Sequence, residues 1–333
     1  MTEQRSGLFS AGEAAGIIGA ACRGNLEAAI ANVVVDSRQA VPNSLFVALP
    51  GERADGHDYI ETALARGATA VLAATAQREK ALQAFSSFAS PGVCLILVDA
   101  PLQGLQALAR EHRRRLKGLL RIGVTGSSGK TTTKECIAAA LKPSYPAGAV
   151  AMNEGNLNSD IGLSLSMFEL NEGHALGVFE MGMNRRGEME ELAAIYEPDI
   201  VVVTNIGIAH IGMIGSREGI AAEKKMVFSR FDGRQKALVW EDDPFKEFLA
   251  RGVPGRFIEF GHKSCRGFEG AESLGLQGWT IRWKAQRFLF PLPDRHNLLN
   301  GLAALALAAE LGTDPALTAQ GLSSVRPLLG RSE

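Results

Sequence analysis

The segment RIGVTGSSGKTTTKE, residues Arg121–Glu135, constrains the fold more than any other part of the chain. An apolar run leads into a loop rich in glycine and serine, and a helix-forming segment follows directly. In such an arrangement, backbone N–H groups of the loop and of the helix N-terminus can surround phosphate oxygens. The segment therefore predicts a phosphate-binding loop between a buried strand and a helix.

Two residues of this loop have specific expected roles. Lys130 can place a positive charge on the terminal phosphates of a nucleotide, and the hydroxyl of Thr131 can bind Mg²⁺. The common form of the loop has a glycine five positions before the glycine of its Gly-Lys pair, where this chain has Val124. The loop is therefore a variant form. The predicted nucleotide contacts are Gly126, Ser127, Ser128, Gly129, Lys130, Thr131 and Thr132.

The remaining patterns predict an α/β chain with more than one domain. With 333 residues the chain is long enough for two cores. Short apolar runs at 32–38 and 44–49 alternate with helical patterns, which predicts a small N-terminal α/β domain. Farther along, apolar runs such as 175–182 and 199–207 are continuous rather than alternating, which favours a largely parallel sheet covered on both faces. The predicted parts are 1–117, 118–326 and the beginning of a linker at 327–333, from which we expect a fragment of a longer protein.

Composition excludes several classes of function. The chain is 46% hydrophobic, with a formal net charge of -1, so it lacks the basic field that nucleic acids or anionic membranes attract. Its 4 cysteines are scattered without metal-site spacing and are predicted to be reduced core thiols. No uncharged apolar run reaches the ~18 residues of a membrane-spanning helix. We expect a cytoplasmic monomer without nucleic-acid partners or membrane insertion.

The loop form TGSSGKTT resembles that of the ATP-dependent Mur ligases and the related folylpolyglutamate synthetases. The segment DSRQAVPNSLFVALPGERADGH resembles the uridine-nucleotide-binding domain of Mur ligases and argues against the folate enzymes. Three more segments, NEGNLNSDIGLSLSMF, FEMGMNRRGEMEELAAIYEPDIVVVTNIGIAHIGMIGS and RHNLLNGLAALALAAELG, resemble the members of the family that add D-alanyl-D-alanine. The resemblance covers nearly all of residues 30–333. It implies a small uridine-nucleotide-binding domain, a phosphate-loop ATPase domain with a mostly parallel sheet, and a C-terminal Rossmann-like domain that is absent from this chain.

The resemblance also implies an activity. Such a ligase uses ATP to convert the terminal carboxylate of UDP-N-acetylmuramoyl-tripeptide into an acyl phosphate, which the amine of D-alanyl-D-alanine then attacks. ATP and two Mg²⁺ ions are the implied cofactors. Without the acceptor domain, the chain is expected to have little activity by itself. A ligase that adds the third peptide residue, or a non-catalytic module that binds a UDP-sugar or ATP, remains an alternative, and the third residue could be lysine or diaminopimelate.

Three residues outside the loop are candidates for catalysis. Glu180 ends an apolar strand, where the open carboxyl edge of a parallel sheet gives a carboxylate access to a cation. His210 follows the next strand and, by itself, is typical of a structural histidine. Lys224 lies one helical turn before Phe228 and is predicted to point inward with it. The resemblance makes Glu180 a ligand of Mg²⁺, His210 a ligand of the second Mg²⁺, and Lys224 a carbamylated ligand, a role that an error of one residue would transfer to Lys225.

Together with Lys130, these three form the predicted catalytic set, and together with Thr131 they form the predicted metal ligands. Asn297 and Asn300 carry the donors and acceptors that an adenine edge requires, although Asn297 could instead cap a helix. Arg331 resembles a linker arginine that reaches the ATP phosphates in the family.

The remaining candidates concern the uridine-linked substrate. The hydroxyl of Ser37 can bond the sugar or the diphosphate, whereas its neighbours Asp36 and Arg38 could pair with each other. Asn156, Asn158 and Ser159 carry short polar groups that suit the muramyl or peptide part of the substrate. The same three residues would also suit the N-terminal cap of a helix.

Overall fold

The computed structural model describes residues 7–51, 54–88 and 91–326. Within them the chain forms two compact units. The first contains the residues before Lys117 together with Ser164–Leu170, and the second contains Lys117–Leu163 and the residues from Asn171 onward. Each unit has its own sheet and its own hydrophobic core, which confirms the predicted α/β class.

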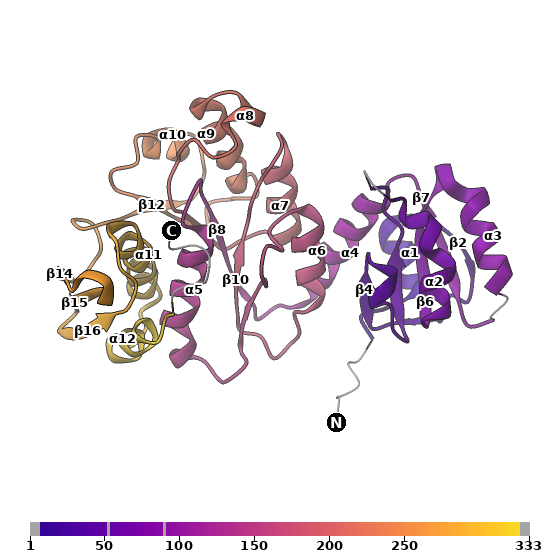
Figure 1. The fold of residues 1–333 in the computed structure, drawn as a ribbon, viewed down its shortest axis with the longest axis horizontal. Coiled ribbons are helices and arrows are strands. Elements are labelled where there is room, and N and C mark those ends of the chain that lie inside the picture. Colours follow the sequence, from indigo (N-terminus) through magenta and orange to yellow (C-terminus); the bar gives the residue numbers. More distant parts are fainter. Residues whose placement is uncertain (1–6, 52–53, 89–90, 327–333) are drawn as a thin grey trace. The chain divides into compact units, whose positions relative to one another are not determined.

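The first unit is built on a five-stranded sheet with the strand order β2-β7-β6-β5-β4. Neighbouring strands are parallel except at one edge, where β2 runs antiparallel to β7. The strands are β2 (Ala21–Gly24), β4 (Asn32–Val34), β5 (Ser44–Val47), β6 (Ala68–Ala74) and β7 (Cys94–Val98), and a separate ribbon joins β1 (Phe9–Ser10) to β3 (Ala29–Ile30). The helices, indigo to purple in Figure 1, are α1 (Ala11–Ile18), α2 (Ile60–Ala65), α3 (Arg78–Phe88) and α4 (Pro101–Arg115).

The second unit is built on a six-stranded parallel sheet with the order β13-β12-β11-β8-β10-β9. Its strands are β8 (Leu120–Thr125), β9 (Val150–Met152), β10 (Leu176–Glu180), β11 (Ile200–Val203), β12 (Lys236–Trp240) and β13 (Arg256–Phe260). The register pairs Val124 with Glu180 on one side of β8, and Thr125 with Val203 on the other. The segments that follow β8, β10 and β11 therefore emerge together at the carboxyl edge of the sheet, where open α/β folds bind ligands.

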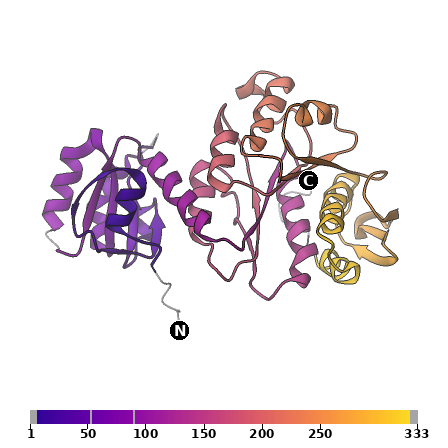
Figure 2. The same ribbon diagram turned by 180° about the vertical axis from the view of Figure 1, so that it is seen from behind.

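The helix after the phosphate loop is central to the second unit. This helix, α5 (Lys130–Leu141), packs against α11 (Arg295–Leu311) and α12 (Pro315–Ser323), which lie beside it in both views (Figures 1 and 2). The alanine and leucine side chains of α11 are small or flexible enough to pack closely in this core. The other helices of the second unit are α7 (Glu188–Tyr196), α8 (Ile211–Ile214), α9 (Arg217–Lys225) and α10 (Lys246–Ala250), and α6 (Asp160–Phe168) begins in the second unit and ends in the first. None of the described helices is long and apolar enough to cross a membrane.

A small antiparallel sheet follows β13 and was not predicted from the sequence. Its strands are β14 (Phe268–Ser273), β15 (Trp279–Trp283) and β16 (Gln286–Phe290). On β15, Ile281 and Trp283 are buried whereas Arg282 between them is exposed, so one face of this sheet joins the core of the second unit. The neighbouring helix α12 contacts β16.

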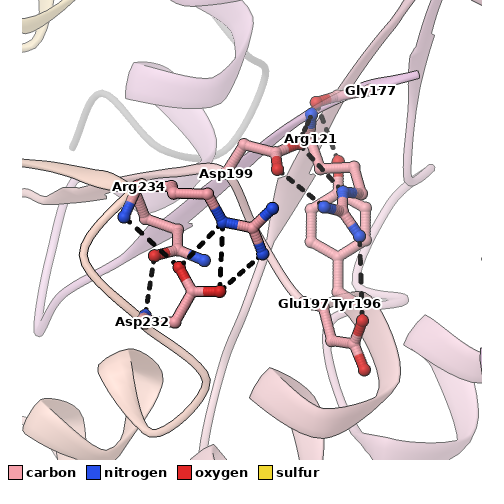
Figure 3. Close-up of polar contacts among 8 residues, drawn as sticks. Arg121, Gly177, Tyr196, Glu197, Asp199, Asp232 and Arg234 are labelled. Carbon is pink, nitrogen blue, oxygen red and sulfur yellow. Dashed lines mark hydrogen bonds and ion pairs between the residues drawn. The ribbon is translucent and has the colours of Figure 1, made fainter. Parts of the chain in front are cut away.

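The amino edge of the six-stranded sheet is held by an ion pair (Figure 3). At the beginning of β8, the Arg121 guanidinium donates Nε–H and Nη2–H to the two carboxylate oxygens of Asp199, at 2.9 and 2.6 Å. The Tyr196 hydroxyl donates to the Gly177 carbonyl oxygen at 2.8 Å. These contacts fix β8, β10 and the beginning of β11 at the end opposite to the phosphate loop.

Candidate functional site

The phosphate loop, residues 126–129, connects β8 to α5 as the sequence predicted. Gly129 directly precedes α5 with φ 77°, a left-handed conformation that glycine adopts without steric cost. The Lys130 ammonium donates to the Gly126 carbonyl oxygen at 3.1 Å, so this side chain folds back against the loop. The loop thus has both groups that bind phosphate in such sites, a helix N-terminus and a lysine.

Two residues that follow β11 hold the loop in place. Thr204 Oγ1 donates to the Ser128 carbonyl oxygen at 2.6 Å. The Asn205 carboxamide donates to the same oxygen at 3.1 Å and accepts from the Ser128 amide at 3.2 Å. Because these bonds already fix the loop, a phosphate group would bind without first ordering it.

Gly126 is the position at which this clamp leaves no room for a side chain. Its φ is 147°, and a Cβ atom there would lie 1.9 Å from Thr204 Oγ1. We expect Gly126→Ala to displace the loop and weaken ADP binding by roughly 5- to 150-fold, the equivalent of about 1–3 kcal/mol of backbone strain. Calorimetric titration with ADP would measure the effect. The matched control is Gly118→Ala, where a Cβ would meet nothing within 4 Å; equal affinities for the two variants would show that the clamp does not restrict the loop.

Glu180, at the end of β10, is buried and fully bonded. Glu180 is only 3% exposed, and Thr131 Oγ1 donates to its Oε2 at 2.6 Å. Asn158 Nδ2 donates to the other oxygen, Oε1, at 2.7 Å. The structure therefore brings together two of the predicted metal ligands, a hydroxyl and a carboxylate, directly beside the phosphate loop. Oxygen ligands of these kinds suit Mg²⁺.

Lys224 lies on α9 and is completely buried. Its Nζ has no hydrogen-bond partner in the described part of the chain. Burial, and to a smaller extent the positive charge of Lys130, lower the pKa of the Lys224 ammonium to about 7 against an opposing effect of Glu223. A buried amine that is partly neutral near pH 7 is typical of a reactive lysine rather than of a structural one.

The neighbours of Lys224 on α9 explain its inward direction. Glu223 accepts from the Gly187 amide at 3.0 Å and from the Met189 amide at 3.1 Å, at the N-terminus of α7. Lys225 donates to the carbonyl oxygens of Phe248 and Arg251 at the end of α10. With these neighbours bound to α7 and α10, Lys224 projects into the interior, and Lys225 is engaged elsewhere.

His210 directly precedes α8 and adopts φ 68°. Burial lowers the pKa of its imidazole, and so do the positive charges of Lys224 and Lys130, while Glu188 has the opposite effect. A lowered pKa favours the neutral imidazole, which is the form that binds metal ions. Among the described residues, no group of three or more His, Cys, Asp or Glu side chains is arranged to hold a metal.

A cavity of about 810 Å³ adjoins the phosphate loop on the side of α11. Its lining includes Ser128 and Thr132 from the loop region, Trp240, and both predicted adenine contacts, Asn297 and Asn300. A volume of this size lies in the range of small-molecule sites. The phosphate loop and the two asparagines thus border one cavity.

The two asparagines have defined partners. Asn300 accepts the Thr133 hydroxyl on its Oδ1 at 3.0 Å, which links α11 to α5. Asn297 Nδ2 donates to the Pro293 carbonyl oxygen at 2.8 Å. The alternative in which Asn297 caps the helix is wrong, because α11 begins at Arg295 and its N-cap residue is Asp294.

Asp294, the residue that precedes α11, has an unusual backbone conformation. It adopts φ 69° and ψ 148°, a conformation that costs any residue with a Cβ. We expect Asp294→Gly to raise the free energy of unfolding by about 1 kcal/mol, after allowance for the larger chain entropy of glycine. Urea denaturation would measure it. The contrasting variant is Asp314→Ala, which removes a carboxylate that caps α12 and should cost about 1 kcal/mol; a less stable Asp294→Gly variant would contradict the argument.

The substrate candidates have varied surroundings. In the first unit, Ser37 is buried at the beginning of a short 3₁₀ helix. Its neighbours form the ion pair that the sequence allowed: Arg38 holds the pKa of the Asp36 carboxyl at about 2 through side-chain and backbone hydrogen bonds. In the second unit, Asn158 contacts Glu180, whereas Ser159 Oγ accepts from the Gly162 amide at 3.3 Å.

The capping role that the sequence allowed is therefore present for Ser159. Asn156 is exposed. Arg331 lies outside the described residues. The substrate roles of these residues remain predictions.

Sequence reasoning missed two buried residues beside Glu180. Asn153 follows β9 and forms hydrogen bonds with the backbone of Glu180, and Lys134 on α5 donates to the Asn153 carbonyl oxygen. The sequence carried a signal for Lys134, because this lysine lies three and four positions before the buried Ile137 and Ala138, on the helix face that enters the core. Asn153 carried no comparable signal.

Comparison with known proteins shows what the chain is similar to. Residues 124–308 match the Mur ligase middle domain, and residues 29–113 match the catalytic domain of the Mur ligase family. The UDP-N-acetylmuramoyl-tripeptide–D-alanyl-D-alanine ligase of Treponema pallidum (strain Nichols) is 40% identical over 303 residues, 90% of this chain and 64% of that protein. The chain thus spans less than two thirds of this curated relative.

Two solved structures are also similar. A crystal structure of MurF from Acinetobacter baumannii has a TM-score of 0.85 and 26% identity, covering 97% of this chain and 69% of the other. The MurF ligase of Thermotoga maritima, in complex with ADP, has a TM-score of 0.76 and 29% identity, covering 90% of this chain and 67% of the other.

The parallel sheet, its loop and the buried carboxylate beside it define an α/β protein of the phosphate-loop class. The matched middle domain accounts for more than half of the chain and includes the phosphate loop, Glu180, His210 and Lys224. The chain belongs to the Mur ligase family. The resemblance read from its motifs is therefore confirmed.

Proposed function

We propose that this chain is the ATP-binding and uridine-substrate-binding part of an ATP-dependent ligase. The ligase adds D-alanyl-D-alanine to UDP-N-acetylmuramoyl-tripeptide through an acyl phosphate, in peptidoglycan precursor synthesis. The observation that carries the proposal is the contact of Thr131 with Glu180 beside the phosphate loop, at 2.6 Å. It supplies a hydroxyl and a carboxylate where the Mg²⁺ of bound ATP would lie. The UDP-N-acetylmuramoyl-tripeptide–D-alanyl-D-alanine ligase of T. pallidum, 40% identical, supports this choice of acceptor.

The residues of the site divide the chemical work. Lys130 and the amides of residues 126–132 bind the phosphates, and the cavity that Asn297 and Asn300 line receives the adenine. Thr131 and Glu180 would hold one Mg²⁺, while His210 and Lys224 would contribute to a second. Bound Mg²⁺ neutralises the charge that develops on the transferred phosphoryl group. Catalysis by the chain itself is then positioning and charge stabilisation.

Lys224 becomes a metal ligand only if it changes charge. Its neutral amine adds to CO₂, with loss of one proton, to form a carbamate whose two oxygens share one negative charge in place of the lysine cation. The buried Nζ without a hydrogen-bond partner and the lowered pKa of this lysine support the reaction. The carbamate would also remove the repulsion between Lys224 and Lys130.

The parts of the chain have separate roles in the proposal. Residues 1–117 bind the uridine nucleotide through Ser37, residues 118–326 bind ATP, and residues 327–333, with Arg331, begin a linker to a C-terminal acceptor domain. Asn156, Asn158 and Ser159 contact the muramyl or peptide part. The protein is a cytoplasmic monomer. Alone, the chain binds nucleotides but ligates little.

The test uses the chain and a protein that also carries the C-terminal domain. We expect the chain to bind ATP with Mg²⁺ and to bind UDP-N-acetylmuramoyl-tripeptide in calorimetric titrations. We expect the longer protein to release phosphate from ATP only when the tripeptide substrate and D-alanyl-D-alanine are both present. Phosphate release with a UDP-dipeptide substrate and a diamino acid instead would identify the third-residue-adding activity. Binding without phosphate release by the longer protein would identify the non-catalytic module.

A further inference from the structure

Asn153 is a buried residue whose side chain continues the pairing of two strands. The backbones of β9 and β10 pair as far as Met152 and Val178. Beyond that point, Asn153 Nδ2 donates to the Glu180 carbonyl oxygen at 2.9 Å, and the Glu180 amide donates to Asn153 Oδ1 at 2.9 Å. The carboxamide thus binds both backbone groups of Glu180, and Asn153 is only 3% exposed.

Lys134 connects this pair to the helix of the phosphate loop. Its side chain extends from α5, and its Nζ donates to the Asn153 carbonyl oxygen at 2.7 Å. Lys134 is 2% exposed and also lies 3.3 Å from a carboxylate oxygen of Glu135. Because Lys134 is buried on the first turns of α5 and bonded to Asn153, it ties the position of Asn153 to that of the phosphate loop.

The result is that every polar group of Glu180 has a partner. Asn153 binds its backbone, Thr131 binds Oε2 at 2.6 Å, and Asn158 binds Oε1 at 2.7 Å. Without Asn153, the buried amide and carbonyl of Glu180 would lose their partners, and the end of β10 could shift to find others. A shift of well under 1 Å matters to a ligand of Mg²⁺, because this ion requires nearly ideal octahedral geometry.

We propose that Asn153, itself held by Lys134, is a positioning residue that fixes Glu180 for a divalent cation beside the phosphate loop. The inference rests on the proposed role of Glu180 as a metal ligand. Asn153 does not touch the cation; it acts through the backbone of Glu180. Lys134 acts one step farther away, so its replacement should have the same effect on a smaller scale.

The experiment measures the Mg²⁺ dependence of ADP binding to the whole chain. We expect Asn153→Ala to raise the Mg²⁺ concentration for half-maximal enhancement of ADP affinity by roughly 10- to 100-fold, the usual effect of removing a group that orients a metal ligand. In EDTA, the ADP affinity should stay within about twofold of the wild type, because the phosphate loop itself is unchanged. Binding of Mn²⁺ to the ADP complex, followed by electron paramagnetic resonance, provides a second readout of the same site.

Two further variants keep the test decisive if Asn153→Ala unfolds. Asn153→Ser retains a short polar group, and Lys134→Met removes the bond to the Asn153 carbonyl together with the contact with Glu135; both should shift the Mg²⁺ dependence in the same direction, by less. The matched control is Asn171→Ala, which replaces an exposed asparagine in a turn and should change neither quantity. Rescue by serine relative to alanine would distinguish orientation of Glu180 from simple loss of packing.

Glu180→Gln separates this inference from the proposed function. If Glu180→Gln leaves the Mg²⁺ dependence unchanged, Glu180 is not a metal ligand and the proposed function loses its central contact. If Glu180→Gln shifts the dependence whereas the Asn153 and Lys134 variants do not, the positioning role is overturned. It is also overturned if these variants weaken ADP binding equally with Mg²⁺ and in EDTA, since that result would show a general structural role.

Discussion

Replacing Lys130 with alanine is expected to weaken ATP binding to this chain by roughly 30- to 150-fold, because a hydrogen bond from an ammonium to a phosphate contributes about 2–3 kcal/mol. The Lys130 side chain already contacts the loop through the Gly126 carbonyl oxygen, at 3.1 Å. It would therefore reach the phosphates with little loss of side-chain freedom. Isothermal titration with ATP and Mg²⁺ would measure the change.

The control for this variant lies at the other end of the same helix. Lys142→Ala removes an exposed lysine just after α5 and should leave ATP affinity within about twofold, since exposed charges at that distance are screened by salt. Thermal unfolding of both variants would exclude a loss of structure. If Lys130→Ala bound ATP as tightly as Lys142→Ala, the loop at residues 126–129 would not be the phosphate site.

The position of the site followed from the sequence because parallel strands share one carboxyl edge. The loop after β8 and the carboxylate that ends β10 could be placed together without knowledge of side-chain contacts, and the register of Val124 with Glu180 confirms it. The choice of Lys224 over Lys225 came from its spacing to Phe228 together with the family resemblance. The structure adds the physical reason, since Lys225 binds the carbonyl oxygens at the end of α10.

The sequence could not reveal contacts that depend on short or irregular segments. Asn153 follows β9, a strand of 3 residues, which is too short to produce a recognisable pattern. The sheet β14–β16 was missed for two reasons. The turns between its strands carry no strong hairpin signal, and the strands are buried on one face only. The positive φ of Asp294 could likewise be established only from the backbone.

Replacing Lys224 with methionine is expected to make the chain more stable while removing one proposed metal ligand. Lys224 is completely buried, and its Nζ has no hydrogen-bond partner among the described residues. Its pKa is lowered from 10.5 to about 7 in the folded chain. At and below neutral pH, keeping this ammonium in the folded chain costs on the order of 4 kcal/mol relative to the unfolded chain. Methionine has a similar length and no charge, so the variant avoids this cost.

The pH dependence gives this prediction its sharpest test. Between about pH 7 and 10.5 the unfolded chain retains a proton on Lys224 that the folded chain has lost, so the wild-type free energy of unfolding should rise with pH in this window. Below about pH 7 both states are protonated, and the full destabilisation is present. The stability advantage of Lys224→Met should therefore be largest below pH 7 and should shrink as the pH approaches 10.5. Urea denaturation in CO₂-free buffer would measure both proteins across this range. An advantage that does not change with pH would mean that the Lys224 ammonium is solvated in the folded chain, and the proposed reaction of its amine with CO₂ would then lose its physical basis.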